Sequence, residues 1–236
     1  MKFENSIKYN NRYMPDNDIL KFFDEICLAG NIDIVKRGKV YYRARRIKPE
    51  NIRHHDDYQS KFYGFNKEEC LAPPSNQAKA GRANPKNIAY LYFAEDEYTA
   101  LAEVRPSRKD YISIAEIVTN SDLKLFSFRF VEKNISSENY LKRIMSWLSY
   151  SFALPVDNED EIEYLPTQYL AEYIKNRGFD GIKYDSSLAE DGINVALFDQ
   201  TKAEAISSKV YQVQSVLYMA ARETPGEGRK ELTPKI

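Results

Sequence analysis

The sequence predicts an α+β fold, in which a mixed β-sheet has helices inserted between its strands. Segments with apolar residues at helical spacing alternate along the chain with short runs rich in β-branched and aromatic residues. Too few strand–helix–strand units follow one another to build a doubly wound parallel sheet. With 236 residues and 43% hydrophobic content, the chain is long enough to bury a sizeable core in one large domain.

The helices are predicted from apolar spacing together with start and stop signals. The first begins at aspartates and ends at Gly30, and the last ends at Gly178, which is a typical C-cap position. The four predicted helices are residues 16–29, 96–104, 139–152 and 166–176.

The strands are predicted from short apolar or alternating runs between these helices. They are residues 39–47, 89–93, 111–118, 123–128, 181–185 and 193–198. Residues 210–219 have the pattern of a last strand or helix, of which we favour the strand. Residues 48–80 are polar and weakly periodic, and such long loops are uncommon unless they are functional or mobile.

No internal repeat and no clear domain boundary divides the chain. We expect an N-terminal helical extension at 1–38, one main domain at 39–222 and a disordered tail at 223–236. The helix at 16–29 has a strong apolar face, which predicts that it covers the main domain or supports self-association as a homo-oligomer.

Composition argues against several classes of protein. A formal net charge of -1 gives no bulk attraction to nucleic acid or to anionic membranes, and no apolar run reaches the roughly 20 residues that span a bilayer. The N-terminus lacks the apolar segment of a signal peptide, and Cys27 and Cys70 are typical of free thiols, so we expect a cytoplasmic protein. The only histidines, His54 and His55, are adjacent in a polar loop, so no metal centre is expected.

The stretch GRANPKNIAYLYFAEDEYTALAEVRP, at 81–106, contains three polar residues of the kinds that take part in catalysis. Arg82 stands in a turn, Tyr92 follows on a strand, and Glu103 stands among apolar residues in a short helix. Taken singly, each has a plainer interpretation: a solvated arginine, a core tyrosine and an exposed glutamate. Thr99 and Ala100, one turn before Glu103, are small enough to leave room above its carboxylate.

Several motifs in order resemble the RES family, whose members include the toxins of bacterial toxin–antitoxin pairs. The likeness covers residues from about 40 to 200 and is closer to the longer members of the family. The motifs are YYRAR at 41–45, GRANP at 81–85, YLYFA at 90–94, TALAEVRP at 99–106, TQYLAEYIKNRGFDGIKYDSS at 167–187 and NVALF at 194–198.

This resemblance implies a fold like that of ADP-ribosyltransferases, with a split β-sheet and NAD in its cleft. It implies cleavage of the nicotinamide–ribose bond by hydrolysis or phosphorolysis, with NAD as the substrate and no separate cofactor. It also implies the role of a toxin or a defence effector, and a partner antitoxin that blocks the cleft.

The resemblance also implies which residues form the site. It assigns a catalytic role to Glu103, Arg82, Tyr92 and Ser186. It assigns substrate contacts to Arg43, Arg45, Ser187 and Gln168. Asn84 also matches, and we expect it to shape the turn that carries Arg82.

Several alternatives stay open at this point. Arg43 and Arg45 lie on the same strand face and are interchangeable candidates, as are the neighbouring Ser186 and Ser187. The run RARRIK, 43–48, suggests either a nucleic-acid patch or phosphate contacts by one or two arginines, and the net charge favours the second. The sequence does not choose between water and phosphate as nucleophile, or between NAD and NADP. Transfer of ADP-ribose to a macromolecule and non-catalytic NAD binding are the two other functions to be tested.

Overall fold

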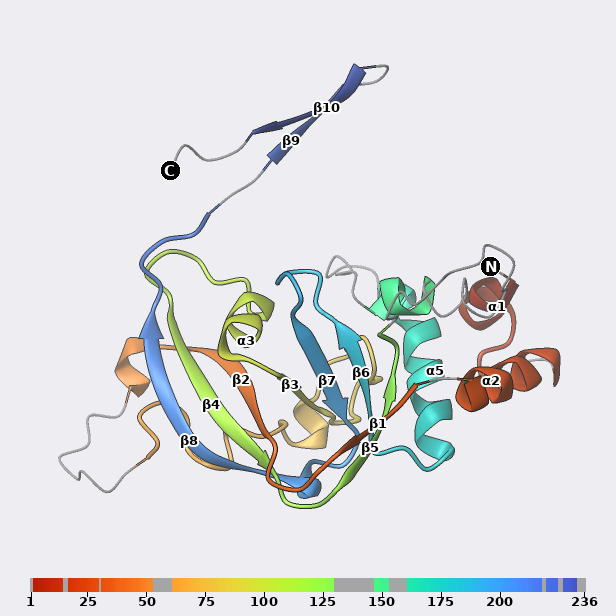
Figure 1. The fold of residues 1–236 in the computed structure, drawn as a ribbon, viewed down its shortest axis with the longest axis horizontal. Helices are drawn as coiled ribbons and strands as arrows, with labels where there is room; N and C mark the ends of the chain where they lie inside the picture. Colours follow the sequence, from red (N-terminus) through yellow and green to blue (C-terminus); the bar gives the residue numbers. More distant parts are fainter. Residues whose placement is uncertain are drawn as a thin grey trace.

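The computed structural model contains one eight-stranded mixed sheet (Figure 1). It describes residues 2–14, 17–29, 31–52, 61–129, 147–152, 161–217, 220–224 and 227–232. The strand order is β1-β5-β6-β7-β3-β2-β4-β8. The strands are β1 Asn31–Val35, β2 Val40–Ile47, β3 Leu91–Ala94, β4 Tyr111–Thr119, β5 Leu123–Ser127, β6 Gly181–Asp185, β7 Ile193–Leu197 and β8 Ala203–Gln212.

The sheet is split between β2 and β3. Strand β2 pairs with β4 along its whole length, but it meets β3 only where Tyr42 lies opposite Ala94. On the other side, β3 pairs with β7 over all four of its residues. Two well-paired halves therefore diverge from one residue pair, and the gap between them gives side chains room to form a cleft. The pairings are antiparallel except that of β5 with β6.

Two helices hold the parts of the sheet that matter for the site. Helix α3, Glu97–Glu103, follows β3 directly, and Asp96 caps it by accepting a hydrogen bond from the backbone N–H of Thr99 at 2.8 Å. Helix α5, Leu165–Asn176, leads into β6 and is followed by Gly178, whose positive φ of 80° allows the chain to turn back.

The N-terminal segment packs against α5. It consists of α1, Lys2–Asn5, a π-helical turn at Ser6–Asn10, and α2, Asn17–Ala29 (Figure 1). Phe3 and Phe23 are buried there with ring centroids 4.8 Å apart in an edge-to-face pair. Residues 147–152 are helical, and short 3-10 turns occur at Pro49–Asn51, Ser75–Gln77, Glu161–Tyr164 and Gln200–Lys202.

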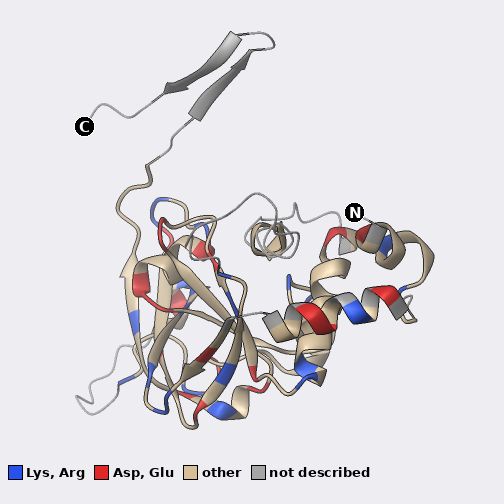
Figure 2. Ribbon diagram, turned by 45° about the vertical axis from the view of Figure 1, so that its right-hand side comes forward, with Lys and Arg blue, Asp and Glu red and all other residues tan. Residues whose placement is uncertain are grey.

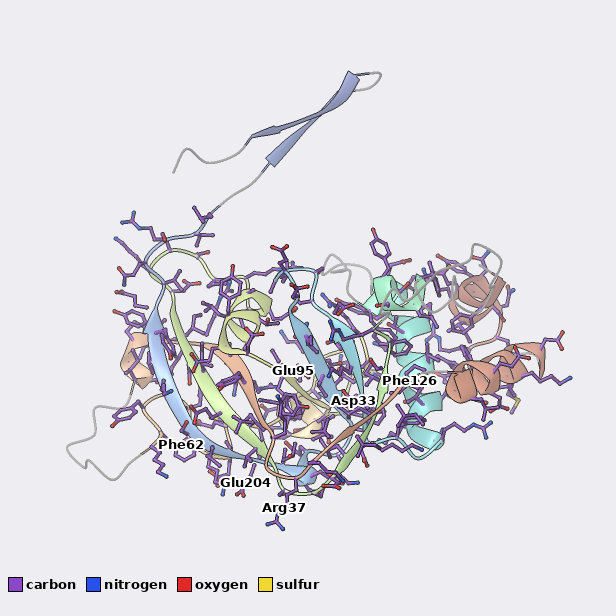
Figure 3. All side chains as sticks on the ribbon, in the orientation of Figure 1. Asp33, Arg37, Phe62, Glu95, Phe126 and Glu204 are labelled. Carbon is purple, nitrogen blue, oxygen red and sulfur yellow. The ribbon has the colours of Figure 1, made fainter. Side chains whose placement is uncertain are left out.

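The core lies on both faces of the sheet. Two clusters of buried side chains pack on the sheet, and neighbouring residues of β5 point into different ones. Phe126 belongs to the cluster that includes residues of α5, and Leu125 belongs to the other. Across the sheet, Lys183 of β6 makes 2.7 Å ion pairs with both Asp33 of β1 and Glu95, which are labelled in Figure 3. Burial lowers the pKa of Lys183, but hydrogen bonds to these two carboxylates outweigh that effect and raise it.

The α+β class and the split sheet predicted from the sequence are confirmed. The predicted helices at 16–29, 96–104 and 166–176 correspond to α2, α3 and α5, and 147–152 confirms the described end of the helix predicted at 139–152. The remainder of that helix lies outside the described residues.

Three expectations need correction. Residues 31–35, assigned to no strand, form β1 and pair with β5, so the N-terminal extension contributes to the main sheet. The strand expected at 210–219 lies earlier, at β8, because 203–212 pair with β4. Part of the tail expected to be disordered forms a two-stranded antiparallel ladder of β9, Ala220–Thr224, with β10, Glu227–Leu232.

Basic and acidic residues are interspersed along the elements of the domain (Figure 2). Among the described helices, none combines the length and the apolar character that a membrane crossing requires.

Candidate active site

A cavity of about 330 Å³ lies where the two halves of the sheet diverge. Its walls come from β2, β3, β6, β7, the last turn of α3 and the turn at Gly81. The lining residues are Tyr42, Arg43, Ala44, Gly81, Arg82, Tyr92, Phe93, Ala94, Ala100, Glu103, Val104, Tyr164, Tyr184 and Asn194. Of the eight predicted site residues, Arg43, Arg82, Tyr92 and Glu103 line this cavity.

Glu103 is held on one side by two hydrogen-bond donors. Ser186 Oγ donates to Oε1 at 2.7 Å, and Asn194 Nδ2 donates to the same oxygen at 2.6 Å. Within the described part of the chain, no hydrogen bond engages Oε2. The carboxylate is therefore fixed in orientation, with one oxygen anchored to the protein and the other available to a ligand in the cavity.

The loop after β6 positions the serine. Ser186 Oγ also accepts hydrogen bonds from the backbone N–H groups of Leu188, at 3.1 Å, and Ala189, at 3.2 Å. The end of this loop approaches α3 so closely that a Cβ on Gly192 would lie 2.7 Å from Thr99 Oγ1. Glycine is thus required for the loop to deliver Ser186 to the helix that carries the glutamate.

The structure distinguishes the two adjacent serines. Ser187 is exposed and does not line the cavity, whereas Ser186 bonds directly to Glu103. The geometry therefore favours Ser186 of the two.

Arg43 places a half-buried guanidinium in the cavity wall, with no acidic partner among the described residues. Its Nη1 donates to the carbonyl oxygen of Tyr92 at 2.9 Å, while its Nε is buried and has no hydrogen bond in the part of the chain described. Burial, with a smaller contribution from the positive charge of Arg45, lowers the pKa of Arg43 to about 10. The group stays charged at neutral pH, and a buried cation without a counter-ion favours the binding of an anion.

Arg82, in the turn after Gly81, supplies a second guanidinium to the cavity wall. Its Nη1 donates to the backbone carbonyl of Phe152 at 2.8 Å. Arginine carries five N–H donors in a rigid fork, so this single bond leaves others able to reach a ligand oxygen.

The turn that carries Arg82 is fixed by three polar side chains, two of them buried (Asn84 and Gln168) and one half-buried (Tyr92). Tyr92 Oη donates to Asn84 Oδ1 at 2.6 Å and accepts from the backbone N–H of Ala83 at 3.1 Å. Gln168 Nε2 donates to the carbonyls of Gly81, at 2.8 Å, and Asn84, at 3.0 Å. The prediction that Asn84 shapes the turn is confirmed, because its Nδ2 also donates to three backbone carbonyls within it.

These contacts bear on the expected roles of Tyr92, Gln168 and Arg45. The ring of Tyr92 walls the cavity, but its hydroxyl is used in holding the turn. Gln168 is buried behind that turn and does not line the cavity. Arg45 is exposed, donates to the carbonyl of Glu69 and lies with its guanidinium carbon 4.3 Å from the centre of the Phe65 ring. The structure therefore favours Arg43 over Arg45 as the cleft arginine.

Among the cavity residues to which the sequence assigned no role, Asn194 and Tyr184 matter most for the site. Asn194 opens the NVALF motif, and Tyr184 precedes the serines of GIKYDSS. An asparagine that is 5% exposed in an otherwise apolar strand was the available signal, because a buried amide needs partners.

The fold and the site together define a split α+β sheet whose cleft holds an anchored carboxylate beside two half-buried arginines. A family model described as the RES domain matches residues 44–220, more than half of the chain, and the protein therefore belongs to the RES domain family. No curated protein matches the sequence. Among solved structures, a similar chain occurs in the crystal structure of the M. tuberculosis MbcT–MbcA toxin–antitoxin complex. That similarity covers 84% of this chain and 93% of the other, with 12% sequence identity and a TM-score of 0.44.

Proposed function

We propose that this protein cleaves NAD at the bond between nicotinamide and ribose. The observation that carries the proposal is the carboxylate of Glu103, which is anchored through Oε1 and has Oε2 free of hydrogen bonds from the described residues. This carboxylate lines the same cavity as the half-buried guanidinium groups of Arg43 and Arg82. The carboxylate suits a ribose that becomes positively charged during the reaction, and the two arginines suit the negatively charged pyrophosphate. NAD contains both groups.

The chemistry requires an anion next to the reacting ribose. As the C1′–N bond breaks, its electron pair leaves with nicotinamide and positive charge develops on the ribose ring. The carboxylate of Glu103 stabilises that charge, and Oε2 is the oxygen able to face it or to orient the incoming nucleophile. Nicotinamide leaves as a neutral molecule and needs no proton, so the site needs no strong general acid.

The two arginines are assigned to the pyrophosphate. Arg43 has no acidic partner among the described residues, and an anion bound beside it would offset the cost of partly burying its charge. Arg82 is fixed through the carbonyl of Phe152 and so presents its remaining donors in a set direction. Holding the pyrophosphate at these points positions the ribose next to Glu103, and such positioning is itself a large part of catalysis.

In the cell, we propose that the protein acts as a toxin or a defence effector by depleting NAD in the cytoplasm. This proposed role is based on membership of the RES family, whose motifs the sequence contains and whose members include toxins. A partner protein that covers the cleft would restrain such an activity, and we propose an antitoxin of this kind.

Product analysis after incubation with NAD tests the proposed reaction. Hydrolysis gives free nicotinamide and ADP-ribose, whereas attack by phosphate gives nicotinamide and ADP-ribose 1-phosphate. Transfer would instead leave ADP-ribose attached to protein or nucleic acid, and it would contradict cleavage to free products. NAD that binds but stays intact would show a binding module and would contradict the proposal as well.

A further inference from the structure

Tyr184 brings to the cavity a hydroxyl group that has no hydrogen-bond partner among the described residues. The side chain is on β6, is only 4% exposed and lines the cavity wall. Its hydroxyl makes no hydrogen bond with any of the residues that the structure describes. Burial raises the pKa of Tyr184, so the hydroxyl stays protonated and is able both to donate and to accept.

The neighbours of Tyr184 locate it between the two chemical parts of the site. In the register of the sheet Tyr184 lies directly opposite Asn194, the residue whose amide anchors Glu103. Its ring also packs against that of Phe152, with centroids 5.8 Å apart, and the carbonyl of Phe152 holds Arg82. Tyr184 thus lies between Asn194, which holds the carboxylate of Glu103, and Phe152, which holds Arg82.

Burial distinguishes Tyr184 from the other tyrosines of the cavity. Tyr42 and Tyr164 also line it but are only partly buried, so water can satisfy their hydroxyl groups. The hydroxyl of Tyr92 is already used in the turn that carries Arg82. The Tyr184 hydroxyl instead opens on the cavity from an otherwise buried side chain, so a ligand in the cavity can serve as its hydrogen-bond partner.

We infer that the Tyr184 hydroxyl binds a hydroxyl group of the ribose that carries nicotinamide. This inference rests on the proposed function, in which Glu103 faces that ribose and Arg82 holds the pyrophosphate next to it. Because Tyr184 lies between the residues that hold Glu103 and Arg82, its hydroxyl is placed to contact the ribose that joins nicotinamide to the pyrophosphate. Tyr184 is then a substrate-binding residue that also limits the ligand to one with a hydroxylated sugar at this point.

The test is Tyr184→Phe compared with a matched control, Tyr90→Phe. Tyr90 is 3% exposed, its hydroxyl is buried without a hydrogen bond among the described residues, and it does not line the cavity. Each substitution removes one oxygen and no hydrogen bond among the described residues, so neither variant should have a lower thermal midpoint than the parent. We expect kcat/KM for NAD to fall about three- to tenfold in Tyr184→Phe and to stay at the parent value in Tyr90→Phe.

Calorimetry with the two products identifies the part of the substrate that is bound. Tyr184→Phe should weaken the binding of ADP-ribose by about the same factor as that of NAD and leave the binding of nicotinamide unchanged. A loss confined to nicotinamide would overturn the assignment to the ribose. If the parent binds and cleaves NAD and the two variants behave alike, the role of Tyr184 is wrong while the proposed function stands. If the parent neither binds nor cleaves NAD, both proposals fail.

Discussion

The sharpest prediction concerns the anchoring of Glu103 by two donors, and the perturbation is Asn194→Ala. Asn194 is 5% exposed, and its amide donates to Oε1 at 2.6 Å, beside the 2.7 Å bond from Ser186. A hydrogen bond to a charged group contributes about 1.5–3 kcal/mol. Loss of one donor in the transition state would therefore reduce turnover by about 10- to 100-fold. Stability should fall by about 1–3 kcal/mol, because a buried amide and its bond are both removed.

The assay is steady-state nicotinamide release, with unfolding in urea to measure stability. Because Asn194 acts through the carboxylate, kcat should fall more than KM rises. In the Glu103→Gln background, Asn194→Ala should cause little further loss, since residues that act as one unit are not additive. Ser187→Ala is the comparison variant, because that side chain is exposed and does not line the cavity. Turnover of Asn194→Ala within twofold of the parent, or a full further loss in the Glu103→Gln background, would refute the reasoning.

Three further predictions follow from the same geometry. In Gly81→Ala a Cβ would lie 2.6 Å from Asn84 Oδ1 and 3.0 Å from Tyr92 Oη, so the turn must shift. We expect the free energy of unfolding in urea to fall by about 1–3 kcal/mol, and an unchanged midpoint would contradict this. Arg43→Met should leave stability equal to that of the parent or about 1 kcal/mol higher, because a partly buried charge with no acidic partner among the described residues is removed. Calorimetry should show at least tenfold weaker NAD binding, and equal affinity would exclude Arg43 from the site. Burial raises the pKa of the Cys70 thiol from 9.0 to about 11, so its contribution to stability is complete below pH 9 and is lost as the pH rises toward 11. Cys70→Ala should therefore lose about 1–2 kcal/mol less than the parent between pH 8 and pH 10.5 in urea unfolding, and identical losses would count against this.

The sequence predicted the elements whose signals are local. Helix α3 has a capping aspartate, and α5 ends before a glycine with positive φ, so both were found. Strand β1 was missed because NIDIV is a five-residue run just after a helix, and only its pairing with β5 makes it a strand. Pairing with β4 likewise determines where β8 begins and ends, and no local signal encodes it.

The candidate site was predictable in its residue types more than in its contacts. Alternation along β2 puts Arg43 and Arg45 on one face, but only the folded loop shows that Phe65 and the carbonyl of Glu69 engage Arg45. The same holds for Ser186: its partner, Glu103, is 83 positions away in the chain. Contacts of this kind depend on how the loop after β6 meets α3, which is a property of the tertiary structure.

The most direct measurement of the central claim is nicotinamide release from NAD by the purified protein beside its Glu103→Gln variant, each with and without phosphate. This substitution replaces the carboxylate by an amide of the same shape and removes the charge that would stabilise the ribose cation. The account predicts release by the parent and at least a hundredfold slower release by the variant, with the two proteins unfolding at similar urea concentrations. Release by Glu103→Gln at the parent rate would contradict the account.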